Sequence, residues 1–240
     1  MQVEAKCIIL DLRKLGESSL IVSCLTQEHG LIKGVYKQRK SKLGSQVVPG
    51  NIMKVVWKAR LEDHLGSFTI EPVRSRAAQV MQDRLALAGL NAVTGILSFV
   101  LPERETHPPL YDRTIALLDL LGQTDIWPLA YLQWEVALLE EMGFALDLSA
   151  CAVSGLNDDL FYVSPRTGRA VSVQAAGEWV NKLLPLPPIL KGEGTGADEE
   201  VVDAQLDALR RELLVQLRAE RQQGVHVDRD GDLVMRDRGL

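Results

Sequence analysis

The chain has few of the residue types that build disulfide frameworks, metal sites and membrane spans. Its 240 residues include 3 cysteines, which stand far apart at positions 7, 24 and 151. This odd, widely spaced set argues against a disulfide framework and against a four-cysteine zinc site within one chain. No apolar run is as long as a membrane-spanning helix, and the first residues lack the layout of a signal peptide. We therefore expect a cytoplasmic protein with no membrane partner.

The sequence also lacks the motifs that carry catalysis. None of its 4 histidines has a carboxylate or a cysteine at metal-ligand spacing. The glycines of residues 192–196 (GEGTG) have no preceding strand and no Gly-Lys-Ser/Thr ending, which indicates a linker. Residues 228–232 (DRDGD) lack the later glutamate of a calcium loop, so a hairpin turn is favoured. We expect no catalytic residue, no metal ligand and no cofactor.

What the sequence does contain is an uneven distribution of charge. The net charge is −5, but residues 1–80 carry 13 Lys and Arg against 7 Asp and Glu, whereas the remainder carries 14 against 25. Because phosphate binding depends on local cation density, a basic module on an acidic body points to a nucleic-acid partner.

The densest group of cations lies in residues 31–42 (LIKGVYKQRKSK), which contain no acidic residue. A run of surface cations is often only a solvated face. Here the run follows a predicted strand, and further cations occur in the same module. The residues that we predict to bind nucleic acid are Arg13, Lys14, Lys33, Tyr36, Lys37, Arg39, Lys40 and Lys42.

Five short strands are predicted in the first 75 residues, with no helical period between them. They cover residues 2–10, 19–26, 31–36, 52–60 and 67–73, and the charged residues 11–18 are expected to end the first of them. This pattern predicts a small closed or nearly closed barrel, a type of fold that binds oligonucleotides. Trp57 alternates with apolar neighbours and is expected in the core, whereas Tyr36 is either a core residue or a stacking platform for a base.

From residue 76 onward the apolar period becomes helical. One helix is predicted up to Pro102, and Pro109 and Pro128 each open another. Gly89 and Gly95 interrupt the first helix and are interpreted as sites of close helix contact. A hairpin is predicted over residues 160–173, an amphipathic helix over 198–223, and a last hairpin over 225–235.

Several short segments resemble the RecO family of bacterial recombination and repair proteins. They are residues 15–19 (LGESS), 25–30 (LTQEHG), 34–37 (GVYK), 87–90 (LAGL), 138–148 (LLEEMGFALDL) and 162–165 (YVSP), and the resemblance covers roughly residues 1–190. It implies an α+β protein with an OB-fold barrel in residues 1–76, and a helical domain in 77–190 with a finger-like insert around 151–173. Residues 191–240 would form a linker, a helix and a hairpin.

The resemblance also implies a function without nucleotide hydrolysis. RecO proteins bind single- and double-stranded DNA, anneal complementary strands, and with RecR help RecA to displace single-strand-binding protein. Many relatives hold zinc through four cysteines in the insert, but here only Cys151 stands at such a position, so we expect no zinc. The tail after residue 191 also lacks the aromatic-Leu-x-x-His pattern of the family, which leaves the role of that segment open. The alternatives are an RNA-binding OB-fold protein and a protein-interaction scaffold.

Overall fold

The structure is a computed structural model that describes residues 1–38, 46–61, 64–122, 127–186, 188–191, 225–227 and 233–235. The chain divides into two compact units, Met1–Glu141 and Met142–Leu240. The first unit contains both the barrel and the helices that follow it.

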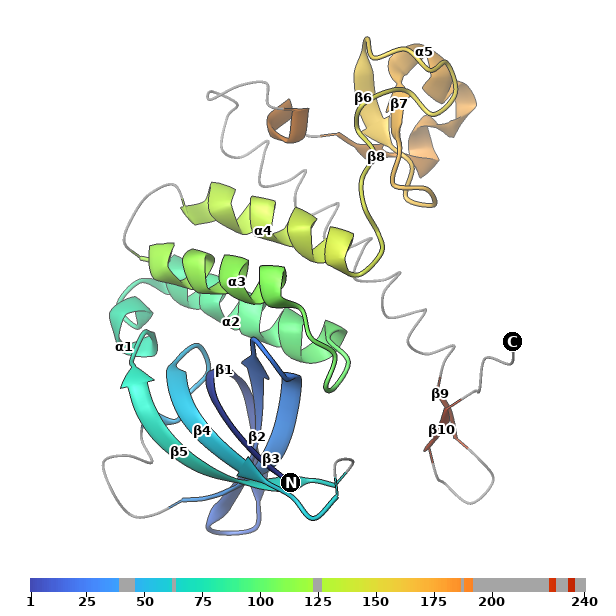
Figure 1. The fold of residues 1–240 in the computed structure, drawn as a ribbon. Coiled ribbons are helices and arrows are strands. Elements are labelled where there is room, and N and C mark those ends of the chain that lie inside the picture. Colours follow the sequence, from blue (N-terminus) through green and yellow to red (C-terminus); the bar gives the residue numbers. More distant parts are fainter. Residues whose placement is uncertain are drawn as a thin grey trace. The chain divides into compact units, whose positions relative to one another are not determined.

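The first unit begins with a closed five-stranded barrel (Figure 1). Its strands are β1 (Gln2–Leu15), β2 (Ser19–Thr26), β3 (Gly30–Lys37), β4 (Ile52–Lys58) and β5 (Gly66–Arg74). They are ordered β1-β2-β3-β5-β4, with β4 closing back on β1 and a short parallel pairing between β3 and β5. The predicted OB-type barrel and the α+β class are thereby confirmed.

The barrel core follows from the alternation of apolar residues along the strands. Met53, Val55 and Trp57 all point inward and are no more than 1% exposed. The prediction that Trp57 belongs to the core is confirmed. Its indole Nε1–H donates to the Lys33 carbonyl oxygen at 2.9 Å, which satisfies the one polar group of the buried ring.

The prediction that residues 11–18 end the first strand is wrong. β1 continues to Leu15, and its pairing with β2 shifts register between Ile9 and Asp11. Such a bulge bends a long strand, and β1 pairs with β4 through its first half and with β2 through its second. The charges of this segment do not break the strand because they lie on exposed or half-exposed positions of the barrel.

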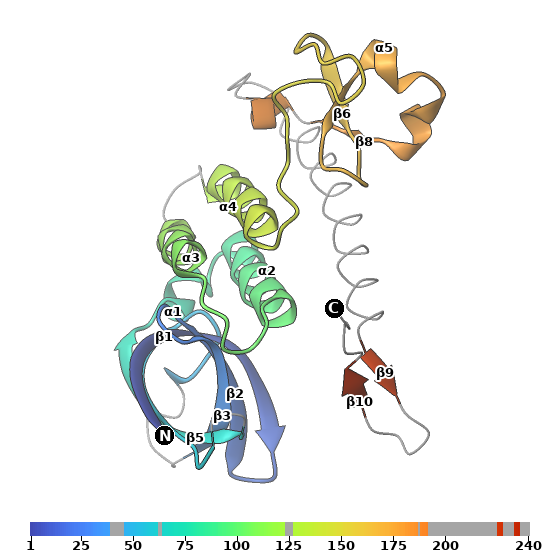
Figure 2. The same ribbon diagram turned by 45° about the vertical axis from the view of Figure 1, so that its right-hand side comes forward.

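Helices cover one end of the barrel, as Figures 1 and 2 show from two sides. They are α1 (Ala77–Val80), α2 (Arg84–Val100), α3 (Pro108–Leu120) and α4 (Trp127–Glu141). α2 begins at the N-cap Asp83, whose carboxylate accepts the N–H groups of Leu85 and Ala86. It packs against the barrel next to Gly50, where a Cβ would overlap the side chain of Leu90.

The two glycines of α2 have different surroundings. A Cβ at Gly89 would lie 2.9 Å from the Trp127 ring, so this glycine permits the close contact that we predicted. A Cβ at Gly95 would meet no atom within 4 Å, and the prediction of a close contact there is wrong.

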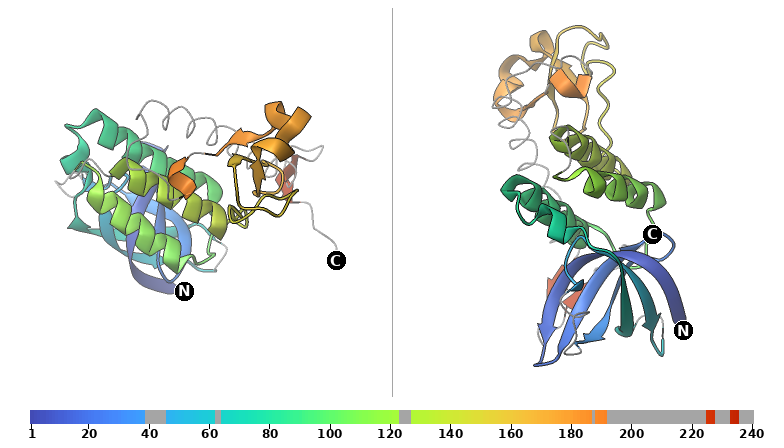
Figure 3. Two further views of the ribbon diagram at one scale, coloured as in Figure 1. Left: turned by 90° about the horizontal axis from the view of Figure 1, so that it is seen from above. Right: turned by 90° about the vertical axis from the view of Figure 1, so that its left-hand side faces the viewer.

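The second unit contains a small three-stranded sheet, seen from above in Figure 3. Its strands are β6 (Leu160–Val163), β7 (Ala170–Ser172) and β8 (Leu184–Pro185), with short helical segments α5 (Val173–Ala176), η2 (Gly177–Lys182) and η3 (Pro188–Lys191). The predicted hairpin of residues 160–173 is confirmed by the β6–β7 pairing. β9 (Val225–Val227) and β10 (Leu233–Met235) also pair as predicted, whereas the predicted helix of residues 198–223 lies outside the described residues.

Candidate nucleic-acid interface

Three of the predicted cations meet where β1 and β3 end. Lys37 lies in the same cross-strand row as Leu15, the last residue of β1. The N–H of Gln38 donates to the Ser18 carbonyl oxygen at 2.8 Å, which holds the end of β3 against the β1–β2 turn. The exposed cations that this arrangement brings together are Arg13, Lys14 and Lys37.

The β4–β5 hairpin adds two more exposed cations to the barrel surface. One row of paired residues crosses all five strands, and its two ends are Lys58 and Arg13, about 19 Å apart at roughly 4.8 Å per strand. Arg60 lies two residues beyond the end of β4 and is exposed, as is Lys58. We call Arg13, Lys14, Lys37, Lys58 and Arg60 the basic cluster.

The cations of the basic cluster remain available for binding. Within the described residues, no carboxylate forms an ion pair with Lys14, Lys37 or Lys58. Arg13 contacts Asp11 at 3.0 Å, but its side chain is 78% exposed. Such an exposed pair contributes little energy and can exchange its partner for a phosphate.

Three of the predicted site residues lie outside the described part of the chain. They are Arg39, Lys40 and Lys42. In the sequence they follow directly on Gln38, whose backbone is held at the β1–β2 turn.

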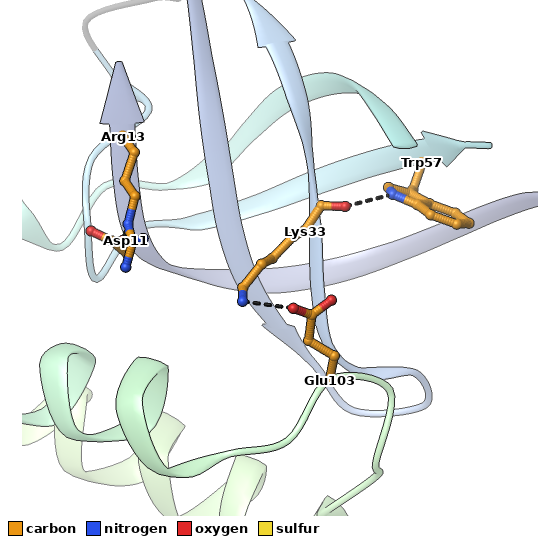
Figure 4. A network of polar contacts seen from close by, with 5 residues as sticks. All are labelled: Asp11, Arg13, Lys33, Trp57 and Glu103. Atoms are coloured by element: carbon orange, nitrogen blue, oxygen red, sulfur yellow. Dashed lines mark hydrogen bonds and ion pairs between the residues drawn. The ribbon is translucent and has the colours of Figure 1, made fainter. Parts of the chain in front are cut away.

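Lys33 lies on the same strand as Lys37 but is already paired (Figure 4). Its Nζ is 2.6 Å from Oε1 of Glu103, which belongs to the connection between α2 and α3. We had placed Lys33 among the cations that contact phosphate, but in this structure its charge is balanced from within the chain.

Of our two expectations for Tyr36, a core position or a stacking platform, the structure supports the core position. Tyr36 is 7% exposed and belongs to the cluster of residues that fills the barrel. Its side chain points inward because it alternates with Lys37, which is exposed. Tyr36 is therefore a core residue, and its ring has no accessible face on which a base could stack in this structure.

Three other cations of the basic module carry internal ion pairs, whereas Lys6 of β1 is exposed and forms none with a described residue. Lys54 contacts Glu4 at 2.6 Å, and this hydrogen bond and charge raise the pKa of Lys54. Arg74 and Arg76 both contact Asp119 of α3, at 2.9 Å and 2.6 Å. Cation count alone therefore overstates the phosphate-binding capacity of residues 1–80.

Sequence reasoning counted Lys58 and Arg60 in the module but did not assign them to the site. The strand alternation of residues 52–60 puts Lys58 on the outer face, and this was visible in the sequence. Its position in a row with Arg13 was not, because it depends on how the barrel closes.

The second unit holds the one cysteine of the insert in a distinctive environment. Cys151 is 1% exposed, and its Sγ accepts hydrogen bonds from the N–H groups of Ser172 at 3.3 Å and Ser154 at 3.5 Å. Burial raises the pKa of this thiol, but the hydrogen bonds from Ser154 and Ser172 outweigh it and lower the pKa to about 6.

We find no metal-binding group in the part of the chain that the structure describes. Within those residues, no three His, Cys, Asp or Glu side chains are placed to hold one ion. None of the described helices is long and apolar enough to cross a membrane.

Comparisons with known proteins identify the family. Residues 1–76 match the family model described as Recombination protein O N terminal, and residues 81–219 match the one described as Recombination protein O C terminal. The chain is 57% identical over 205 residues to the DNA repair protein RecO of Roseobacter denitrificans, with 85% of each chain covered. It is 54% identical over 198 residues to that of a Ruegeria species and 48% identical over 203 residues to that of Paracoccus denitrificans, with 82% and 84% of each chain covered. The chain therefore belongs to the RecO family of DNA repair proteins.

Proposed function

We propose that this protein is a non-enzymatic DNA-binding mediator of recombinational repair and that it meets DNA through the basic cluster. The observation that carries the proposal is that Arg13, Lys37 and Lys58, on three different strands of one OB-type barrel, are all exposed, with Lys37 held beside the end of β1. Small barrels of this type bind oligonucleotides through strand faces and flanking loops.

The chemistry of the cluster favours contact with the phosphate backbone. Ammonium and guanidinium groups bind phosphates without reading the base sequence, so affinity should depend strongly on salt and weakly on sequence. A protein that acts on any damaged or single-stranded region needs this kind of binding. Arg39, Lys40 and Lys42, which follow Lys37 closely in the sequence, would add further phosphate contacts.

Membership of the RecO family supports a finer proposal. The protein would bind single- and double-stranded DNA, anneal complementary strands, and act with RecR to help load RecA onto strands covered by single-strand-binding protein. Neutralising phosphates on two strands at once lowers their mutual repulsion, which is the physical requirement for annealing. The described residues offer no nucleophile–base constellation, and the proposed activity requires none.

The experiment that tests the proposal measures fluorescence anisotropy of a labelled single-stranded DNA oligonucleotide across a series of salt concentrations. A strand-annealing assay without ATP follows on the same preparation, with an RNA oligonucleotide of the same sequence as a second ligand. We expect salt-sensitive DNA binding and annealing. Absence of binding at low salt, or clear preference for RNA, would contradict the proposal.

A matched variant locates the interface. Changing Lys37, Arg39 and Lys40 together to Ala should flatten the dependence of log K on log salt by about 0.7 for each lost contact to single-stranded DNA. An unchanged slope would mean that DNA binds elsewhere on the molecule.

A further inference from the structure

Lys33 and Glu103 form a close ion pair on the outside of the barrel (Figure 4). The distance from Nζ to Oε1 is 2.6 Å, and the two side chains are 36% and 49% exposed. Both groups are accessible to solvent, so burial does not force them together. A module with an excess of cations thus neutralises one of them with an acid.

The backbone of the α2–α3 connection is attached to β3 and holds Glu103 in place. Glu103 forms a parallel β-bridge with Leu31, and the Arg104 N–H donates to the Leu31 carbonyl oxygen at 2.9 Å. A Cβ at Gly30 would overlap the Glu105 carbonyl, so the connection lies directly on the start of β3. The Glu103 carboxylate is therefore attached next to its cation on a tethered segment.

The ring of Trp57 provides a second anchor for this segment. The guanidinium carbon of Arg104 lies 4.6 Å from the centre of the Trp57 ring, and Arg104 has a positive φ of 65°. A residue other than glycine is held in this conformation only when its surroundings favour it. Cation–π contact and the hydrogen bond to Leu31 together stabilise the conformation that presents Glu103 to Lys33.

Lys33 occupies a position that a bound strand would pass. It lies on the same face of β3 as Lys37, four residues earlier, which corresponds to about 13 Å along an extended strand. One OB-fold covers roughly 4–16 nucleotides of single strand, so DNA on the basic cluster would come within reach of Lys33.

We propose that Glu103 determines which cations of the barrel contact DNA. Its carboxylate occupies the place beside Lys33 that a phosphate would take, and it thereby keeps Lys33 out of the DNA contacts. This inference rests on the proposed DNA-binding function. Because Lys33 is already neutralised by a tethered carboxylate, a phosphate that displaced Glu103 would exchange one ion pair for another and would leave Glu103 beside the DNA backbone. Glu103 thus confines phosphate contact to the basic cluster.

The test is a double-mutant cycle on the full chain, with Glu103→Gln, Lys33→Gln and the double variant, measured by anisotropy with labelled single-stranded DNA across salt. The matched control is Glu105→Gln, which removes one negative charge from the same connection at an exposed residue that forms no ion pair with a described residue. It separates release of Lys33 from a general change in net charge.

We expect Glu103→Gln to bind more tightly and to steepen the salt slope by about 0.7, so that the change in affinity between about 50 and 200 mM salt grows by roughly a factor of three. Adding Lys33→Gln should abolish this gain. Lys33→Gln alone and Glu105→Gln should leave the slope at the wild-type value.

The possible failures can be told apart. If the wild-type chain does not bind DNA at all, the proposed function fails. A second outcome is that the wild-type chain binds, but Lys33→Gln alone lowers the salt slope or Glu103→Gln leaves it unchanged. Glu103 then does not keep Lys33 from contacting DNA, and this inference is overturned. An equal gain in Glu105→Gln would assign the effect to net charge and would also overturn it.

Discussion

The guanidinium of Arg76 and the carboxylate of Asp119 connect the barrel to the helices. Nε and Nη2 of Arg76 lie 2.7 Å and 2.6 Å from Oδ1 of Asp119. Arg76 is 2% exposed, and its backbone N–H donates to the side chain of Asn51, in the segment before β4. The residue that follows the barrel is thereby fixed both to the barrel and to α3.

Removing this carboxylate should destabilise the first unit. Asp119→Ala leaves the buried Arg76 cation without its partner, and we expect a loss of about 2–3 kcal/mol in the free energy of unfolding. Urea unfolding followed by tryptophan fluorescence measures it. Asp11→Ala is the control, since its pair with Arg13 is exposed and should cost less than about 1 kcal/mol. Equal losses in the two variants would show that Arg76 does not depend on Asp119.

The two glycines of α2 should respond in opposite directions to the same substitution. Gly95→Ala fills open space on an exposed helical position and should stabilise the protein by about 0.5–1 kcal/mol. Gly89→Ala places a Cβ against the Trp127 ring and should destabilise it by about 1 kcal/mol or more, because the ring must shift. Thermal unfolding of both variants measures these changes in stability. A higher stability of Gly89→Ala than of the wild type would show that α4 can move away from α2.

Two lysines of the barrel should differ in their effect on DNA binding. Lys37→Ala removes a cation without an ion pair in the described residues and should lower the salt slope for single-stranded DNA by about 0.7. Lys54→Ala removes a lysine that is paired with Glu4 and should leave the slope unchanged. Anisotropy titrations across salt compare them. A similar fall in both would place the DNA on the β1–β4 face as well.

The thiol of Cys151 should make stability depend on pH. Its pKa is about 6 in the folded protein, where Ser154 and Ser172 bind the sulfur, and about 8.5 in an unfolded chain. Between these values the unfolded chain binds more protons, so the free energy of unfolding should rise with pH from about 6 to about 8.5 and be lost as pH falls through 6.

The measurement is a series of urea unfolding curves at several pH values for the wild-type chain and for Cys151→Ser. The variant has no thiol at this position, and its pH dependence over that window should be flatter. Curves that run parallel for the two proteins would mean that the thiol is protonated in the folded state.

The zinc content of the wild-type preparation tests a further expectation, that this protein binds no zinc. A metal assay that finds about one zinc per chain would contradict it.

Much of the fold could be predicted from periodicity. The alternation of Met53, Val55 and Trp57 identified an inward face, and prolines at 109 and 128 marked two helix starts. The extent of β1 could not be predicted in this way, because a bulge near Ile9 lets the strand continue through charged residues. Local sequence shows where charges lie but not whether a bend turns them outward.

By itself, the sequence indicated the five barrel strands, the starts of the long helices and the number of cations that the barrel module carries. Tertiary structure decided which of those cations remain available. Lys33 is paired with an acid 70 residues away and Arg76 with one 43 residues away, whereas Lys37 and Lys58 keep their charges unpaired within the described residues. Ion pairing depends on distances of a few ångströms between side chains, and closure of the barrel and packing of the helices set these distances.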